Sequence, residues 1–95
     1  IYASGDITAF SDMRMKENIK PIENALERVK QIGGYTYNKV GETTKDVGVL
    51  AQEVMKVFPE VIRGSEDTNY SVAYGNMVAI LIEAIKELSA KVDEK

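Results

Sequence analysis

Two residues near the start of the chain have the side chains of a nucleophile and its base. Ser11 and Lys16 stand five positions apart in the segment Ser-Asp-Met-Arg-Met-Lys. A serine hydroxyl is a weak nucleophile and needs an adjacent base. A lysine serves as that base only as the neutral amine, which desolvation or a nearby positive charge favours. Arg14 could supply the charge, and burial between chains could supply the desolvation.

The same segment also has a simpler interpretation. A serine and a lysine at this spacing are common in proteins, so Ser11 could be an ordinary turn or cap residue. Arg14 and Lys16 would then be solvated surface charges. Residue types alone do not choose between the two interpretations.

The composition excludes most other catalytic sites. The 95 residues include no histidine and no cysteine, which excludes a Ser-His-Asp triad, a Cys-His pair and the usual zinc sites. The glycines form neither of the common nucleotide-binding patterns. Glu23 and Glu27 lie one helical turn apart, as is typical of a solvated helix face. We therefore expect neither a metal nor another cofactor.

Charge and hydropathy limit the possible partners. The net charge is −3 with both signs interspersed, so we expect no basic patch and no nucleic-acid partner. The longest apolar run, Met77–Ile82, is far shorter than the roughly 20 residues of a membrane span. The first residues lack the pattern of a signal peptide, and we expect no membrane association. A small domain without disulfides often gains stability by oligomerisation.

The first half of the chain must position the candidate pair. Residues Ile1–Phe10 are interpreted as the end of a larger upstream segment, with a short strand over 7–10, and the domain itself as 11–95. Apolar residues at helical spacing predict a helix over Ile22–Ile32, with Pro21 at its first position.

Short strands and one short helix follow. Alternation predicts strands at 35–37 and 47–49, joined as a hairpin by the polar turn 41–46. A helix is predicted over 50–57, ending before Pro59. Further strands are predicted at 61–62 and 70–74, on either side of a loop at 64–69.

The segment Asn76–Lys95 carries the strongest helix pattern. Apolar residues recur at spacings of 3, 4, 3 and 4, which is a heptad seam: Val78, Leu81, Ile85, Leu88 and Val92. Two heptads are also compatible with a helix packed on its own domain. Ile80, Ile82 and Ala84 widen the apolar surface, so we expect the first half of the helix to be covered on two sides. The predicted fold class is α+β, with a small antiparallel sheet, two short helices and a long C-terminal helix.

Several ordered segments together resemble the peptidase S74 family, the intramolecular chaperone domains of phage tail fibres, tailspikes and neck appendages. Ser11–Ile19 is similar to the entry motif of that family, Ser-Asp-x-Arg-x-Lys-x-Asn-Ile. The similarity continues in order through Pro21–Glu27, Tyr35–Asn38, Gly48–Val54, Phe58–Glu60, Val72–Tyr74 and Leu81–Leu88.

The resemblance implies roles for single residues. Ser11 would be the nucleophile, Lys16 its general base, and the bond cut would join Phe10 to Ser11. The other matching motif positions are given supporting roles, which turn capping would explain equally well: Asp12, Arg14 and Asn18. Attack within one chain and attack on a neighbouring chain are both open.

The resemblance also implies a function. The domain would form a homotrimer through the seam residues of the last helix and align three copies of an upstream fibrous β-structure. It would then release itself by one cleavage per chain, during assembly in the host cytoplasm, and the parent protein would stand in the virion tail fibre or tailspike. The alternative is a permanent trimerisation or capping module that never cleaves. The presence of both Ser11 and Lys16 favours the protease.

Overall fold

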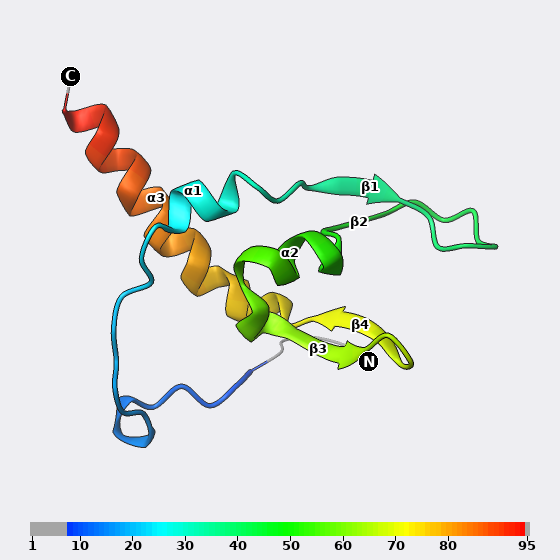
Figure 1. Cartoon of the computed structure of the whole chain (residues 1–95), viewed down its shortest axis with the longest axis horizontal. Helices are drawn as coiled ribbons and strands as arrows, with labels where there is room; N and C mark the ends of the chain where they lie inside the picture. Colours follow the sequence, from blue (N-terminus) through cyan, green and yellow to red (C-terminus); the bar gives the residue numbers. More distant parts are fainter. Residues whose placement is uncertain (1–7, 95) are drawn as a thin grey trace.

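The computed structural model describes residues 8–94 as an α+β fold, which confirms the predicted class (Figure 1). The helices are α1 (Ala25–Val29), α2 (Ala51–Val57) and α3 (Met77–Asp93). The strands are β1 (Tyr35–Tyr37), β2 (Asp46–Gly48), β3 (Ile62–Ser65) and β4 (Asn69–Val72). Three short 3-10 turns are η1 (Met13–Met15), η2 (Pro59–Val61) and η3 (Tyr74–Asn76). The strands form two separate antiparallel hairpins, β1–β2 and β3–β4, instead of one sheet.

Helix α1 is much shorter than the sequence pattern predicts. It begins at Ala25 because Asn24 takes a left-handed backbone conformation, with φ of 55°, which a right-handed helix does not admit. Its first N–H groups are bound by a distant side chain: Glu87 of α3 accepts from the backbone N of Ala25 at 2.9 Å and of Leu26 at 3.0 Å. The prediction that Pro21 opens the helix is therefore wrong.

The first hairpin is confirmed and lies one residue earlier than predicted on its second strand. Thr36 pairs with Val47, and Gly41 takes a φ of +85° in the connecting turn. Glu53 of α2 anchors the hairpin, because its carboxylate accepts from the Tyr35 hydroxyl at 2.9 Å and from the Gly33 backbone N at 3.0 Å. The pKa of Tyr35 is raised, chiefly by that hydrogen bond.

The strands of the second hairpin extend further toward their connecting loop than predicted. Ser65 pairs with Asn69, so the loop is only residues 66–68. Gly64 and Asn69 each stay paired with the opposite strand, Gly64 with Tyr70 and Asn69 with Ser65, although their φ values are positive, at 88° and 66°. Turn-forming residue types thus fall inside the strands, and composition alone placed the loop boundaries too far apart.

The ends of the second hairpin also differ from the prediction. Val61 was predicted to begin a strand at 61–62 but lies in η2, before β3, and its carbonyl accepts from the backbone N of Ala73 at 2.8 Å. Strand β4 ends at Val72, and Tyr74 begins η3, which leads directly into α3. The chain therefore leaves the hairpin two residues earlier than the alternation predicts.

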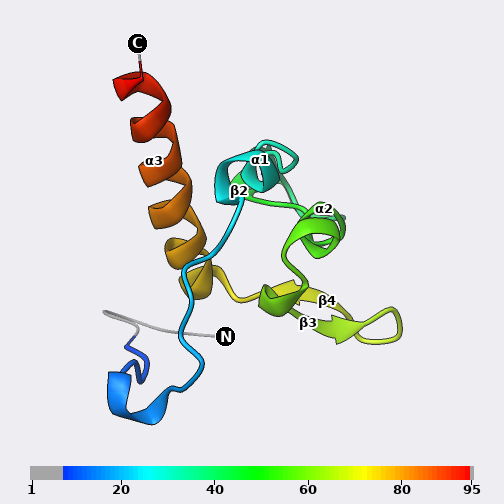
Figure 2. The same ribbon diagram turned by 60° about the vertical axis from the view of Figure 1, so that its left-hand side comes forward.

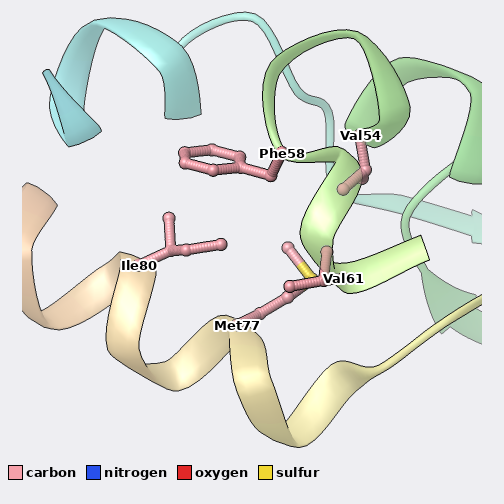
Figure 3. Packing of buried hydrophobic residues seen from close by; sticks show 5 residues of the cluster. All are labelled: Val54, Phe58, Val61, Met77 and Ile80. Carbon is pink, nitrogen blue, oxygen red and sulfur yellow. The ribbon is translucent and has the colours of Figure 1, made fainter. Parts of the chain in front are cut away.

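The core lies where α2, η2 and the start of α3 meet. Val54, Phe58, Val61, Met77 and Ile80 form one buried cluster (Figure 3). Full burial of each large side chain contributes about 1.5–3 kcal/mol. Arg28 of α1 stacks over the Phe58 ring, with its guanidinium carbon 4.1 Å from the ring centroid. The N-terminal segment that contains Ser11 and Lys16 contributes no residue to this cluster.

Helix α3 has two apolar faces with different surroundings. Met77, Ile80 and Ala84 are buried against the rest of the domain. The seam residues are exposed. Figure 2 shows one side of the α3 ribbon with no other helix and no hairpin beside it. Lys95, the end of the predicted helix, lies outside the described residues. Over residues 8–94, no helix has the length and apolar character needed to cross a bilayer.

The segment 8–21, which we call the arm, precedes this body. Every residue of the arm is exposed. Thr8–Phe10 form no strand, and Ile7, where the predicted strand begins, lies outside the described residues. Figures 1 and 2 show the arm in blue, leaving α1 and looping back toward the start of α3.

Candidate active site

The arm brings the two candidate catalytic side chains into contact. Lys16 Nζ donates a hydrogen bond to Ser11 Oγ at 2.8 Å. The short helix η1 produces this approach, since the backbone N of Met15 bonds to Asp12 O and that of Lys16 to Met13 O, each at 3.1 Å. A single tight turn therefore converts a five-residue spacing into a direct contact.

Asp12 organises this turn and binds Arg14. One carboxylate oxygen of Asp12 accepts from the Arg14 backbone N at 2.9 Å and from Nε at 3.1 Å. The other oxygen accepts from Arg14 Nη2 at 2.7 Å. The side-chain bond, and then the backbone bond, hold the pKa of Asp12 below its ordinary value of 3.8. The same contact raises the pKa of Arg14.

The Asp12–Arg14 ion pair bears on the suggestion that Arg14 favours a neutral Lys16. A positive charge disfavours a second one nearby only to the extent that it is not compensated. Because Asp12 binds Arg14 in a forked contact, most of that charge is offset locally. Desolvation is then the stronger of the two routes to a neutral lysine.

Asn18 contributes through its backbone. It adopts a φ of 56°, in the left-handed region that asparagine tolerates better than most residues. The conformation turns the chain shortly after Lys16 and before the run toward α1. Among the three residues given supporting roles, Asp12 and Arg14 shape the turn by side-chain bonds, and Asn18 shapes the exit from it.

A groove connects the arm to the start of α3. The arm side consists of Ala9, Phe10, Ser11 and Lys16, and the facing wall consists of Gly75, Asn76, Val78, Ala79 and Ile82. Sequence reasoning assigned Val78 to a trimer contact and missed the rest of this wall. The wall lies more than 50 positions from the arm in the sequence, and only the tertiary path of the arm joins the two.

In the single chain, Ser11 and Lys16 are exposed to water. Their side-chain atoms lie at hydrogen-bond distance. A general base accepts the proton of the serine hydroxyl, and a lysine can do so only as the neutral amine. The arrangement therefore has the two partners of a serine–lysine pair at the right distance for that proton transfer.

The predicted trimer contacts form an uncovered apolar stripe along α3. Their exposed fractions lie between 46% for Leu81 and 65% for Ile85. Val78, Leu88 and Val92 fall within that range, and Ile82, at 51%, adjoins the stripe. Contiguous apolar surface of this kind is typical of an interaction site. Val78 of the stripe and the adjoining Ile82 also line the groove beside Ser11 and Lys16.

Comparison with known proteins places these features in context. Residues 11–63, more than half of the chain, match the Peptidase S74 profile, described as "chaperone of endosialidase". The chain is 41% identical over 93 residues to the long tail fiber protein Gp37 of Enterobacteria phage K3, covering 88% of this chain and 8% of that protein.

Two further Gp37 proteins are similar over nearly the whole chain. That of Enterobacteria phage M1 is 37% identical over 101 residues, which cover 94% of this chain and 39% of that protein. That of Salmonella phage S16 is 32% identical over 100 residues, which cover 94% of this chain and 13% of that protein. The chain thus spans well under half the length of these curated relatives.

Proposed function

The chain belongs to the peptidase S74 family of endosialidase chaperones, and on that premise we propose that it is an intramolecular chaperone of a phage tail fibre that cuts itself free. The domain trimerises, helps the upstream β-structure to fold, and is then released by cleavage between Phe10 and Ser11. The fibre relatives support the chaperone role and a place in the virion tail fibre. The 2.8 Å contact between Lys16 Nζ and Ser11 Oγ carries the cleavage part of the proposal.

The uncovered stripe on α3 supports the chaperone role. Three stripes packed together would bury side chains that water now contacts, which is favourable by about 25 cal/mol for each Å² of apolar surface. Trimeric fibres pair strands between chains, a topology that folds slowly and risks mispairing. A trimeric domain at the end of each chain raises the effective concentration of the upstream segments. Folding then takes place in the host cytoplasm, between chains already in register.

The cleavage chemistry uses the two side chains in sequence. Neutral Lys16 takes the proton of Ser11 Oγ as that oxygen attacks the carbonyl carbon of Phe10. The tetrahedral intermediate collapses as the peptide C–N bond breaks, and the departing Ser11 nitrogen takes the proton from Lys16. Water then hydrolyses the Phe10 ester, releasing a carboxylate and restoring the hydroxyl. Each chain reacts once, so the protein is a single-turnover endopeptidase.

Assembly would supply the desolvation of Lys16 that the single chain lacks. Lys16 is exposed in the single chain, and the wall of its groove includes Val78 of the α3 stripe and the adjoining Ile82. A neighbouring copy seated on the stripe would exclude water from the mouth of the groove. Desolvation disfavours the ammonium form, so the base becomes available when the trimer has formed.

The test is intact mass of the fibre polypeptide with its natural upstream segment. We expect the wild type to yield a fragment beginning at Ser11, while Ser11→Ala and Lys16→Ala remain whole. Lys16→Arg is the matched control, because it keeps the positive charge but cannot act as a base near neutral pH. A wild type that stays whole while trimeric and folded would refute the protease, and a permanent trimerisation module would replace it.

A further inference from the structure

The cleavage chemistry leaves one requirement unassigned. Attack on the Phe10 carbonyl places negative charge on its oxygen, and enzymes stabilise such an oxyanion with hydrogen-bond donors fixed in advance. Among the described residues that line the groove beside Phe10, only Lys16 is charged, and it already bonds to Ser11. The facing wall and the backbone N–H groups are the remaining sources of a donor in the groove.

The wall offers one polar side chain. Among the described residues that line the groove, only Ser11, Lys16 and Asn76 carry polar side chains. The rest of the lining is glycine, alanine or larger apolar residues, which also keep the groove poor in competing hydrogen-bond partners. Asn76 is thus the neutral side-chain donor that shares a groove with the bond to be cut.

The conformation of Asn76 leaves its carboxamide available. Asparagine at the N-cap of a helix commonly bonds through its side chain to the first N–H groups of that helix. Asn76 occupies the N-cap of α3, but its backbone is already helical (φ −72°, ψ −22°) and its side chain makes no cap bond. Its backbone N instead donates to Ala73 O at 3.0 Å, which fixes the residue at the end of η3.

We propose that the Asn76 carboxamide donates a hydrogen bond to the oxyanion that forms on the Phe10 carbonyl oxygen. This inference rests on the proposed cleavage at Phe10–Ser11 and names a further catalytic residue for it. Asn76 takes no proton and forms no bond to carbon. Its NH₂ group stabilises the negative charge while Lys16 moves the proton between Ser11 Oγ and the leaving nitrogen.

The test compares Asn76→Asp with the wild type in the full fibre polypeptide. Asp is nearly isosteric and is also favoured at N-caps, so α3 should be retained, but an ionised carboxylate has no N–H to donate. Loss of one oxyanion donor slows comparable reactions by about 10²–10³-fold, and we expect a loss of that order. Gln52→Glu, at an exposed position of α2, makes the same amide-to-acid change away from the groove and should leave the rate unchanged.

Two further measurements separate this role from a structural one. Asn76→Ala removes the donor without adding charge, and we expect a similarly slowed rate with the melting temperature and trimer preserved. The pH at which the rate is half-maximal should stay where it is, because the base is unaltered. A loss of rate that only accompanies a loss of trimer would overturn the inference.

The outcomes also separate this inference from the proposed function. If the wild type is not cut, or Ser11→Ala is still cut, then the proposed self-cleavage itself fails. If the wild type is cut, Ser11→Ala is not, and both Asn76 variants are cut at the wild-type rate, then only the role of Asn76 is wrong.

Discussion

The body of the domain and its arm are held in place by different means. The body has a buried cluster and hydrogen bonds that join residues more than 60 positions apart, such as those from Glu87 to α1. The arm is exposed throughout, and its side-chain bonds join near neighbours, from Asp12 to Arg14 and from Lys16 to Ser11. Ser11 and Lys16 therefore lie on the part that the single chain supports least, while Asn76 lies on the body. Such a division suits a reaction that waits for partners.

Loss of the central core side chain should produce the largest effect on stability. Phe58→Ala removes the ring that packs in the cluster and under Arg28, and such substitutions cost about 3–5 kcal/mol. Chemical denaturation, in a Ser11→Ala background that prevents cleavage, measures the free energy of unfolding. A loss below about 1 kcal/mol would mean that the body is not organised around this cluster.

A charge in the α3 stripe should abolish assembly while the body remains folded. Leu81→Glu and Ile85→Glu place carboxylates where three copies would meet, and like charges there disfavour association. We expect light scattering to report monomers, circular dichroism to report intact helix, and mass spectrometry to report uncleaved chain. Ala90→Glu, at an exposed position of the same helix outside the heptad seam, is the matched control and should remain trimeric. A cleaved monomer would contradict the dependence of the arm on its partners.

The contact between Glu87 and the start of α1 should make a smaller, pH-dependent contribution to stability. Bonds from the backbone N of Leu26 and then of Ala25 hold the pKa of Glu87 below its ordinary value of 4.5. Because the folded-state pKa is depressed, the stabilisation is complete above the unfolded value and is lost as the pH falls through the folded one. We expect Glu87→Gln to lower the melting temperature by several degrees at neutral pH.

The difference in melting temperature between Glu87→Gln and the wild type should shrink as the solution is acidified below the ordinary pKa of a glutamate. Glu83→Gln serves as the control, since Glu83 pairs with Lys86 at 3.3 Å on the same helix. A gap between wild type and Glu87→Gln that is constant with pH would show that the carboxylate charge is not what stabilises the start of α1.

The arm should give the smallest effect on stability. Met15→Ala removes a large side chain that is 85% exposed, and surface substitutions of this kind change the free energy of unfolding by less than about 0.5 kcal/mol. Denaturation of the Leu81→Glu monomer isolates this effect from assembly. A larger loss there would show that the arm packs on its own body, and the contrast between the two regions would disappear.

The sequence predicted the elements whose causes are local. The periodicity of α3 and the alternation of the first hairpin were sufficient, and Pro59 correctly ended α2. The start of α1 was misplaced because Asn24 takes a left-handed conformation and the cap comes from Glu87, 62 residues away. The ends of the second hairpin were misplaced because Gly64 and Asn69 remain in register with positive φ.

The candidate site was only half visible in the sequence. The family resemblance selected Ser11 and Lys16, and the structure brings their side chains together. The wall that contains Asn76 was not found, because nothing local to residues 75–82 links them to the arm. In a sequence, an asparagine before a helix is interpreted as an ordinary N-cap. The structure distinguishes Asn76 from such a residue, because its side chain makes no cap bond.

The bonds between Glu87 and the first turn of α1 also determine how the domain bears load. The arm enters the body at α1, and α1 is fastened to α3 by Glu87 and to the end of α2 by Arg28, whose Nη2 donates to Val57 O. Tension from an upstream fibre would therefore pass from the arm through α1 into α3, the helix that we propose joins three copies. Both hairpins lie off that path, so a pull on the fibre would strain the helical frame and leave the strand pairs unstretched.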